Sequence, residues 1–181
     1  MLFRSTGGQN LAAFVNRMTR PGENVQGVSY RYLPASEQAA QLAYQALWAT
    51  VFLTFLAKLV LLRIRGVPVS AFELSMIFLA GLLLSPITFT THLVSLLFVY
   101  HTFLSIRLAS LSPPARVAAA LLFVAMAVTG LSGRDLAGST VYLAVGGYSA
   151  YVWTMLLLFV TAVVLAGREA PSLRTVAAPA T

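Results

Sequence analysis

The feature that most constrains this chain is a series of long apolar runs separated by short polar breaks. The runs cover about 38–62, 71–84, 90–108, 115–131 and 139–166. Hydrophobic residues make up 59% of the sequence and charged residues 9%, whereas a soluble domain is about half apolar and a quarter charged. A backbone in lipid must satisfy its hydrogen bonds internally, and apolar helices do so. We therefore expect an all-α polytopic membrane helix bundle with about five transmembrane helices.

The charge pattern argues against a nucleic-acid partner. There are 12 Lys and Arg residues against 5 Asp and Glu, but the basic residues stand singly between the apolar runs instead of forming a stripe. The chain has no cysteine, which excludes thiolate metal sites and disulfides. No clustered metal ligands are present either, so we expect no metal and no cofactor.

Three regions are expected along the chain. Residues 1–36 form an outward-facing interfacial segment, in which apolar residues at helical spacing between Leu11 and Met18 predict a short amphipathic helix on the membrane or capping the bundle. An ordinary polar connection is the alternative. Residues 37–166 form the transmembrane bundle. Residues 167–181 are polar and contain proline, which predicts a disordered tail.

The short loops indicate an orientation. The loops that precede the second and fourth apolar runs carry arginines, whereas the loop after the fourth run carries Arg134 alone. The arginines of the first group are Arg63, Arg65, Arg107 and Arg116. Since cytoplasmic loops are enriched in Lys and Arg, the first group and the C-terminus are expected in the cytoplasm. The segment 1–36, the corner 85–91 and the loop 132–138 are then expected on the outer side.

The acidic residues have structural explanations. Ser70 and Glu73 form a capping box before the second apolar run. Asp135 lies in a polar loop, where a single carboxylate is usually solvated. No paired carboxylates, nucleophile elbow, phosphate-binding loop or metal-ligand cluster is present.

Chemistry is most expected at the polar corner after Leu84, where one apolar run stops at Ser85-Pro86 and the next opens with His92. Ionisable residues within a membrane are functional candidates by default. The other histidine, His101, lies nine residues further on. On a straight helix this is about 13 Å deeper and on the opposite face, so the two histidines cannot share one site.

Two segments resemble glycosyltransferase family 87. Residues 85–94, Ser-Pro-Ile-Thr-Phe-Thr-Thr-His-Leu-Val, resemble the family's Ser-Pro-Ile-Ser-Trp-x-His-His-Phe-Val signature. Residues 24–31, Asn-Val-Gln-Gly-Val-Ser-Tyr-Arg, resemble its Asn-Gln-Ser-x-x-Gly-x-x-x-Arg segment. The likeness covers roughly residues 22–165. Phe89 and Thr91 depart from the family's tryptophan and first histidine.

The resemblance implies a C-type mannosyltransferase of a bacterial-type plasma membrane, which moves a hexose from a polyprenyl-phosphate donor to a glycolipid or glycan. His92 would be the catalytic residue. Arg31, Asn24, Ser85 and Thr91 would bind the donor and its phosphate, since a guanidinium suits phosphate oxygens. The family's acidic catalytic half has no counterpart here. The chain is therefore expected to be a C-terminal fragment, a diverged remnant, or one piece of a split enzyme that works with a missing N-terminal half or a partner chain.

Two other readings stay open. The chain could be a non-catalytic membrane subunit or scaffold, whose small-residue helix faces bind a partner. It could also be a small transporter-like bundle that uses His101 and Lys58. Membrane lipid is an expected partner in every case.

Overall fold

A computed structural model describes residues 10–19, 33, 35–85, 94–105 and 112–167, and within these ranges it contains helices and no strands. The helices are α1 Leu11–Thr19, α2 Glu37–Ile64, α3 Ala71–Leu84, α4 Leu96–Leu104, α5 Pro113–Leu131, α6 Arg134–Gly147 and α7 Ala150–Leu165. The predicted all-α helix bundle is thereby confirmed. The expected tail falls almost entirely outside the described residues.

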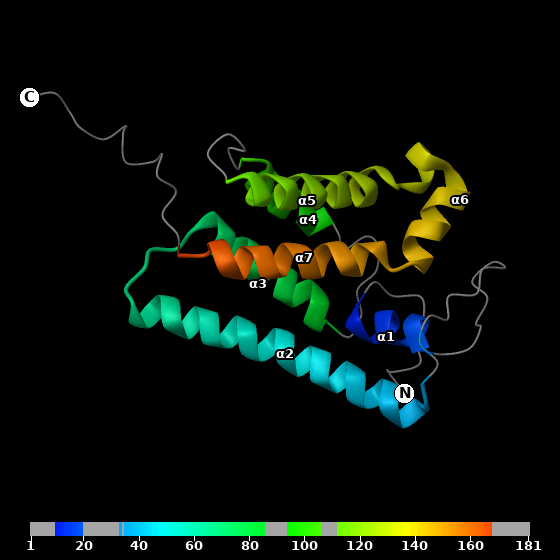
Figure 1. The fold of residues 1–181 in the computed structure, drawn as a ribbon, viewed down its shortest axis with the longest axis horizontal. Helices are drawn as coiled ribbons and strands as arrows, with labels where there is room; N and C mark the ends of the chain where they lie inside the picture. The colour runs from blue at the N-terminus through cyan, green and yellow to red at the C-terminus, as the bar shows by residue number, and fades with distance from the viewer. Residues whose placement is uncertain (1–9, 20–32, 34, 86–93, 106–111, 168–181) are drawn as a thin grey trace, which may run out of the picture.

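Helix α3 is the centre of the bundle (Figure 1). It contacts α7, α2 and α4, and Figure 1 draws it behind α7. Its buried side chains face those of α7 and α4, and together they form the core. The side chains among them that are less than 2% exposed include Met76, Leu79, Leu83, Val99, Phe103, Met155 and Leu158. In lipid such a core is held by van der Waals packing and interhelical hydrogen bonds.

Side-chain caps begin α2 and α3 where the sequence predicts them. The Ser36 hydroxyl accepts a hydrogen bond from the backbone N–H of Ala39, at 3.2 Å. The Ser70 hydroxyl accepts one from the N–H of Glu73, also at 3.2 Å. Each cap satisfies a donor that the first turn of a helix leaves unpaired. The bounds expected for the second apolar helix, 71–84, are confirmed.

Within the ranges that the structure describes, fewer than five helices qualify as membrane spans. Among the described residues, α2 and α5 are long and apolar enough to cross a membrane. Helices α6 and α7 pass the same test together, although they are bent by 62° at the break between them. They would add a third span if they form one broken span. Helix α3 has 14 residues, about 21 Å, and is shorter than the hydrocarbon core.

The expected continuous helix over 139–166 is wrong, because the chain breaks between α6 and α7. Ser149 has the left-handed backbone conformation (φ 57°), which a helix interior does not accept. The break is visible where the yellow α6 turns away from the orange α7 (Figure 1). The apolar run is continuous in sequence, and hydropathy alone does not reveal a change in backbone direction.

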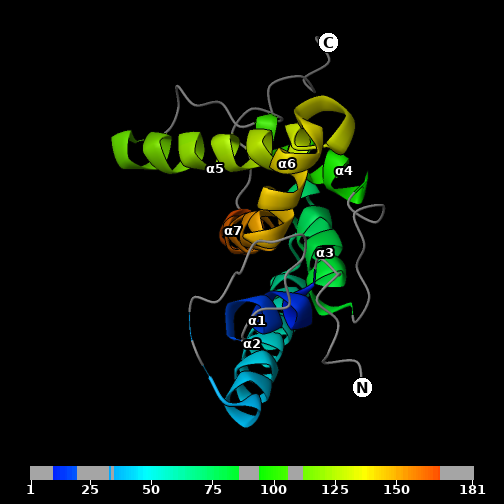
Figure 2. The same cartoon turned by 90° about the vertical axis from the view of Figure 1, so that its right-hand side faces the viewer.

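Helix α1 packs into the bundle. All of its residues except Met18 are buried, and it contacts α2. The Phe14 ring meets the Trp153 ring edge-on at 5.0 Å. The Arg17 Nε donates a 2.7 Å hydrogen bond to the Ser149 hydroxyl. Seen end-on, α1 lies beside α2 (Figure 2). Of the two arrangements expected for the amphipathic segment, capping the bundle agrees with this burial.

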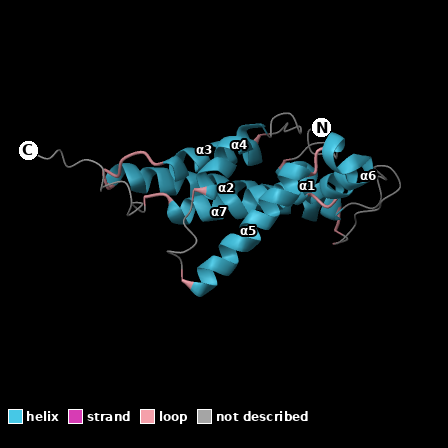
Figure 3. Ribbon diagram, turned by 90° about the horizontal axis from the view of Figure 1, so that it is seen from above, coloured by secondary structure: helices cyan, strands magenta, loops and turns pink. Residues whose placement is uncertain are grey.

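The remaining helix, α5, crosses the others at an angle. From above it runs obliquely away from the bundle (Figure 3). It contacts α7 and α6. The last turn of α5 therefore comes close to the start of α7, and this region forms part of the site described next.

Candidate functional site

Most of the residues predicted for the donor site cannot be placed. Asn24, Arg31, Thr91 and His92 lie outside the described residues. Ser85 is described, and it terminates α3 as the predicted corner requires. Its backbone is extended, and its N–H donates to the carbonyl of Gly81 at 3.1 Å.

The corner is tied to α2 by a side chain. The Trp48 indole Nε1 donates a hydrogen bond to the carbonyl of Leu84, at 3.3 Å. This carbonyl belongs to the last turn of α3, whose acceptors have no partner within the helix. Trp48 also stacks on Phe52, with ring centroids 5.2 Å apart. The end of α3, where the segment that resembles the family signature begins, is therefore fixed to α2.

Beyond the corner, the chain enters the wall of a cavity. Val94, two positions after His92 in the sequence, is one of its lining residues. The cavity has a volume of about 240 Å³ and opens to the surface between α4, α5 and the start of α7. It is lined by Val94, Leu96, Leu97, Tyr100, Thr129, Gly130, Gly133 and Tyr151.

Two tyrosine–hydroxyl pairs stand at this cavity. The Tyr100 hydroxyl lies 2.6 Å from the Thr129 Oγ1. The Tyr151 hydroxyl lies 2.8 Å from the Ser132 Oγ. The sequence did not predict Tyr100, Thr129 and Ser132 as site residues, and it favoured a place in an interfacial aromatic belt for Tyr151. The available signal was weak: Thr129 and Ser132 are three residues apart at the end of an apolar run, a spacing that places both on one helix face.

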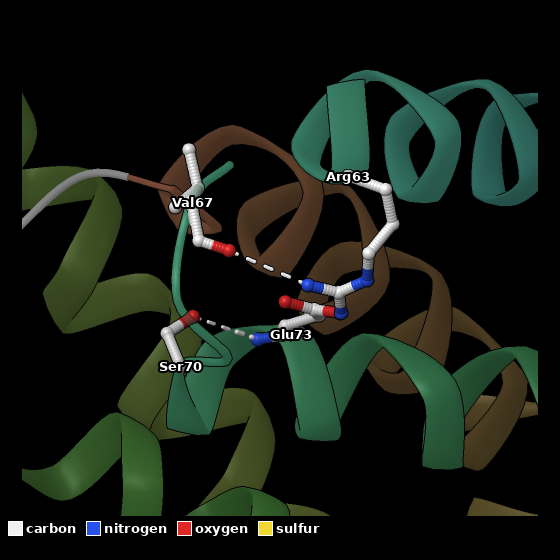
Figure 4. Close-up of polar contacts among 4 residues, drawn as sticks. All are labelled: Arg63, Val67, Ser70 and Glu73. Carbon is white, nitrogen blue, oxygen red and sulfur yellow. Dashed lines mark hydrogen bonds and ion pairs between the residues drawn. The ribbon is translucent and has the colours of Figure 1, made fainter. Parts of the chain in front are cut away.

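A second polar cluster lies at the turn between α2 and α3 (Figure 4). The Arg63 guanidinium pairs with the Glu73 carboxylate and donates a hydrogen bond to the carbonyl of Val67 at 3.4 Å. Glu73 is 1% exposed and Arg63 is 51% exposed. The structural role expected for Glu73 is thus confirmed for its backbone cap, and its carboxylate joins the two helices as well.

The described residues contain no assembled acid–base pair. Glu37 and Asp135 are exposed, and Glu73 is engaged by Arg63. Within the described ranges no three His, Cys, Asp or Glu side chains gather in a way that could hold a metal ion. His101 is exposed on α4 and does not line the cavity. The described part of the chain does not bring together the groups for a proton transfer.

The chain was compared with family models, curated proteins and solved structures, and none of them matches it.

Proposed function

We propose that this chain is the C-terminal membrane portion of a glycosyltransferase that moves a hexose, in the first instance mannose, from a polyprenyl-phosphate donor to a glycolipid or glycan. The observation that carries the proposal is the helix break at Ser85. Helix α3 ends there between two apolar segments, at the start of the sequence that resembles the family signature.

The anchoring of this break supports a binding role for the segment that follows. Trp48 donates a hydrogen bond to the carbonyl of Leu84, the last residue of α3, so the start of the segment has a defined position. Binding groups are most effective when a rigid scaffold presents them. In the proposal, His92 contacts the donor phosphate or the acceptor hydroxyl. Arg31 and Asn24 bind the phosphate, with Ser85 and Thr91 alongside.

The transfer also needs a carboxylate base to accept the proton of the acceptor hydroxyl. The structure describes three carboxylates. Glu37 and Asp135 are exposed, and Glu73 is in an ion pair with Arg63. The proposal therefore assigns the base to a segment or partner chain that joins this portion in the working enzyme.

The test is mannose transfer from polyprenyl-phosphate-mannose by the assembled enzyme in native membranes. His92→Ala is expected to lower kcat/KM by at least about 100-fold, which is the lower end of what a positioned proton-transfer or binding group supplies. His101→Ala is the matched control, because His101 is exposed on α4, and it should leave the rate unchanged. Full activity of the His92→Ala enzyme would rule out the donor-site role.

The alternative is a non-catalytic membrane subunit, and the exposure of α2 favours it. Only three of its 28 residues, Ala40, Val51 and Leu62, are buried within the chain. A subunit role predicts that His92→Ala leaves transfer intact. Substitution of exposed α2 residues such as Ala46→Leu would instead release the chain from its complex, as seen by native mass spectrometry.

A further inference from the structure

The cavity between α4, α5 and α7 has a chemical preference that follows from its hydrogen bonds. A hydroxyl group has one proton to donate. The Thr129 hydroxyl donates it to its own helix, since its Oγ1 lies 2.9 Å from the carbonyl of Ala125. This bond to the carbonyl four residues earlier is the usual one for a threonine in a helix. The network therefore assigns the proton between Tyr100 and Thr129 to Tyr100.

The second pair has the same direction. The Ser132 Oγ donates to the carbonyl of Thr129 at 3.0 Å, so the Tyr151 hydroxyl donates to Ser132. Both tyrosines thus direct their protons away from the cavity toward α5. What remains on each phenolic oxygen is acceptor capacity. A ligand is favoured here when it brings its own O–H or N–H donors, and an anion is disfavoured, because it would place lone pairs against lone pairs.

The opening of the cavity indicates the route of entry. Val94 and Leu97 line it, and both are apolar and 66% exposed. In a membrane protein such side chains face lipid. A volume of 240 Å³ is larger than the 150 Å³ that accepts a benzene ring, and it suits one substituted six-membered ring or a small polar head.

We propose that this cavity is a binding site for a neutral, hydroxyl-bearing amphiphile that enters from the bilayer, and that it rejects anionic heads. The site does not depend on the chain taking part in sugar transfer. Two ligand sources share this chemistry, a glycolipid with an uncharged sugar head and a long-chain alcohol.

The test uses the chain in lipid nanodiscs and an alkyl glycoside that carries a photoreactive diazirine. Labelled peptides are identified by mass spectrometry. Labelling is expected within 94–105 and 126–133, and it should saturate. An unlabelled alkyl glycoside should compete, whereas the alkyl phosphate of the same chain length should not. Competition by the simple alcohol would assign the site to lipid alcohols, and competition by the glycoside alone would assign it to a sugar head. Equal competition by the phosphate overturns the proposal.

Two variants test the hydrogen-bond direction. Tyr100→Phe keeps the ring and removes the acceptor oxygen, so glycoside labelling at half saturation should need about five times more probe, the effect of one neutral hydrogen bond. Tyr148→Phe is the matched control, since Tyr148 is 51% exposed and does not line the cavity.

Thr129→Val frees the Tyr100 proton for the ligand, so the alkyl phosphate should begin to compete. A Tyr100→Phe protein that labels like the wild type would also overturn the proposal, and the gain expected for Thr129→Val cannot arise from misfolding.

Discussion

Glu73 is the one carboxylate that the described part of the chain buries. Burying an ionised group without a partner costs several kcal/mol, and a paired one is tolerated when its geometry is good. Arg63 supplies the charge, while half of its own side chain stays exposed at the turn. The second oxygen of Glu73 has no hydrogen-bond partner. The ion pair therefore stabilises the fold mainly because it leaves no unpaired charge buried in α3, and less through the attraction between its two charges.

This argument predicts an asymmetric mutational result. Arg63→Met should lower the free energy of unfolding by about 1–3 kcal/mol, because it leaves the Glu73 carboxylate buried and unpaired. Arg65→Met, at an exposed position two residues away, is the matched control and should have little effect. Adding Glu73→Gln to Arg63→Met should recover most of the loss. Thermal unfolding in detergent measures all three, and equal midpoints for the two arginine variants would contradict the argument.

The same residue shows what sequence can and cannot predict. The Ser70–Glu73 cap is local, so a spacing of three residues was enough to predict it. The ion pair with Arg63 was not predicted, because it depends on how α2 and α3 fold back on each other. The hydroxyl groups at the cavity were not predicted for the same reason, because their pairing depends on how the helices pack. Tyr100, Thr129 and Tyr151 belong to three helices, and no sequence spacing brings them together.

At the scale of elements, two glycines inside helices differ in backbone conformation. Gly81 lies inside α3 with no atom within 4 Å of an added Cβ. Gly138 lies inside α6 with φ 81° and ψ 166°, a conformation available almost only to glycine. The apolar runs predicted where helices occur. They placed the start of the fifth helix at 139, directly after the irregular Gly138, but they did not predict the bend before α7, because it is a change of backbone direction within otherwise acceptable sequence.

Opposite effects are therefore expected from the same substitution. Gly81→Ala should stabilise the protein by about 0.5–1 kcal/mol, since alanine loses less entropy in a helix and meets no neighbour. Gly138→Ala should destabilise it by about 1–3 kcal/mol, since the alanine would be strained although the space is open. Chemical or thermal unfolding of both variants in one detergent gives the comparison. If Gly138→Ala were neutral, α6 would be a regular helix.

At the scale of the whole molecule, the helix ends form two groups at opposite ends of the long axis. The loop after α2, the start of α5 and the end of α7 lie at one end of the long axis, while α1, the start of α2 and α6 lie at the other (Figure 1). The arginine-rich loops 63–65 and 107–116 were predicted to share one side of the membrane, and the loop around Arg134 the other. The side of the membrane on which each end lies stays a prediction from charge.

The sequence makes a direct test of this prediction clean, because it contains no cysteine. Single cysteines at exposed positions can therefore be labelled one at a time with a membrane-impermeant maleimide in intact cells. Ser36→Cys and Asp135→Cys are expected to react from outside. Val69→Cys and Ser112→Cys should react only after the membrane is opened, since the arginines beside them favour the cytoplasm. Ser36 and Val69 flank α2, so if both react in intact cells, α2 does not span the membrane. If Ser36 and Asp135 react on different sides, the predicted grouping of the start of α2 and α6 at the outer end is wrong.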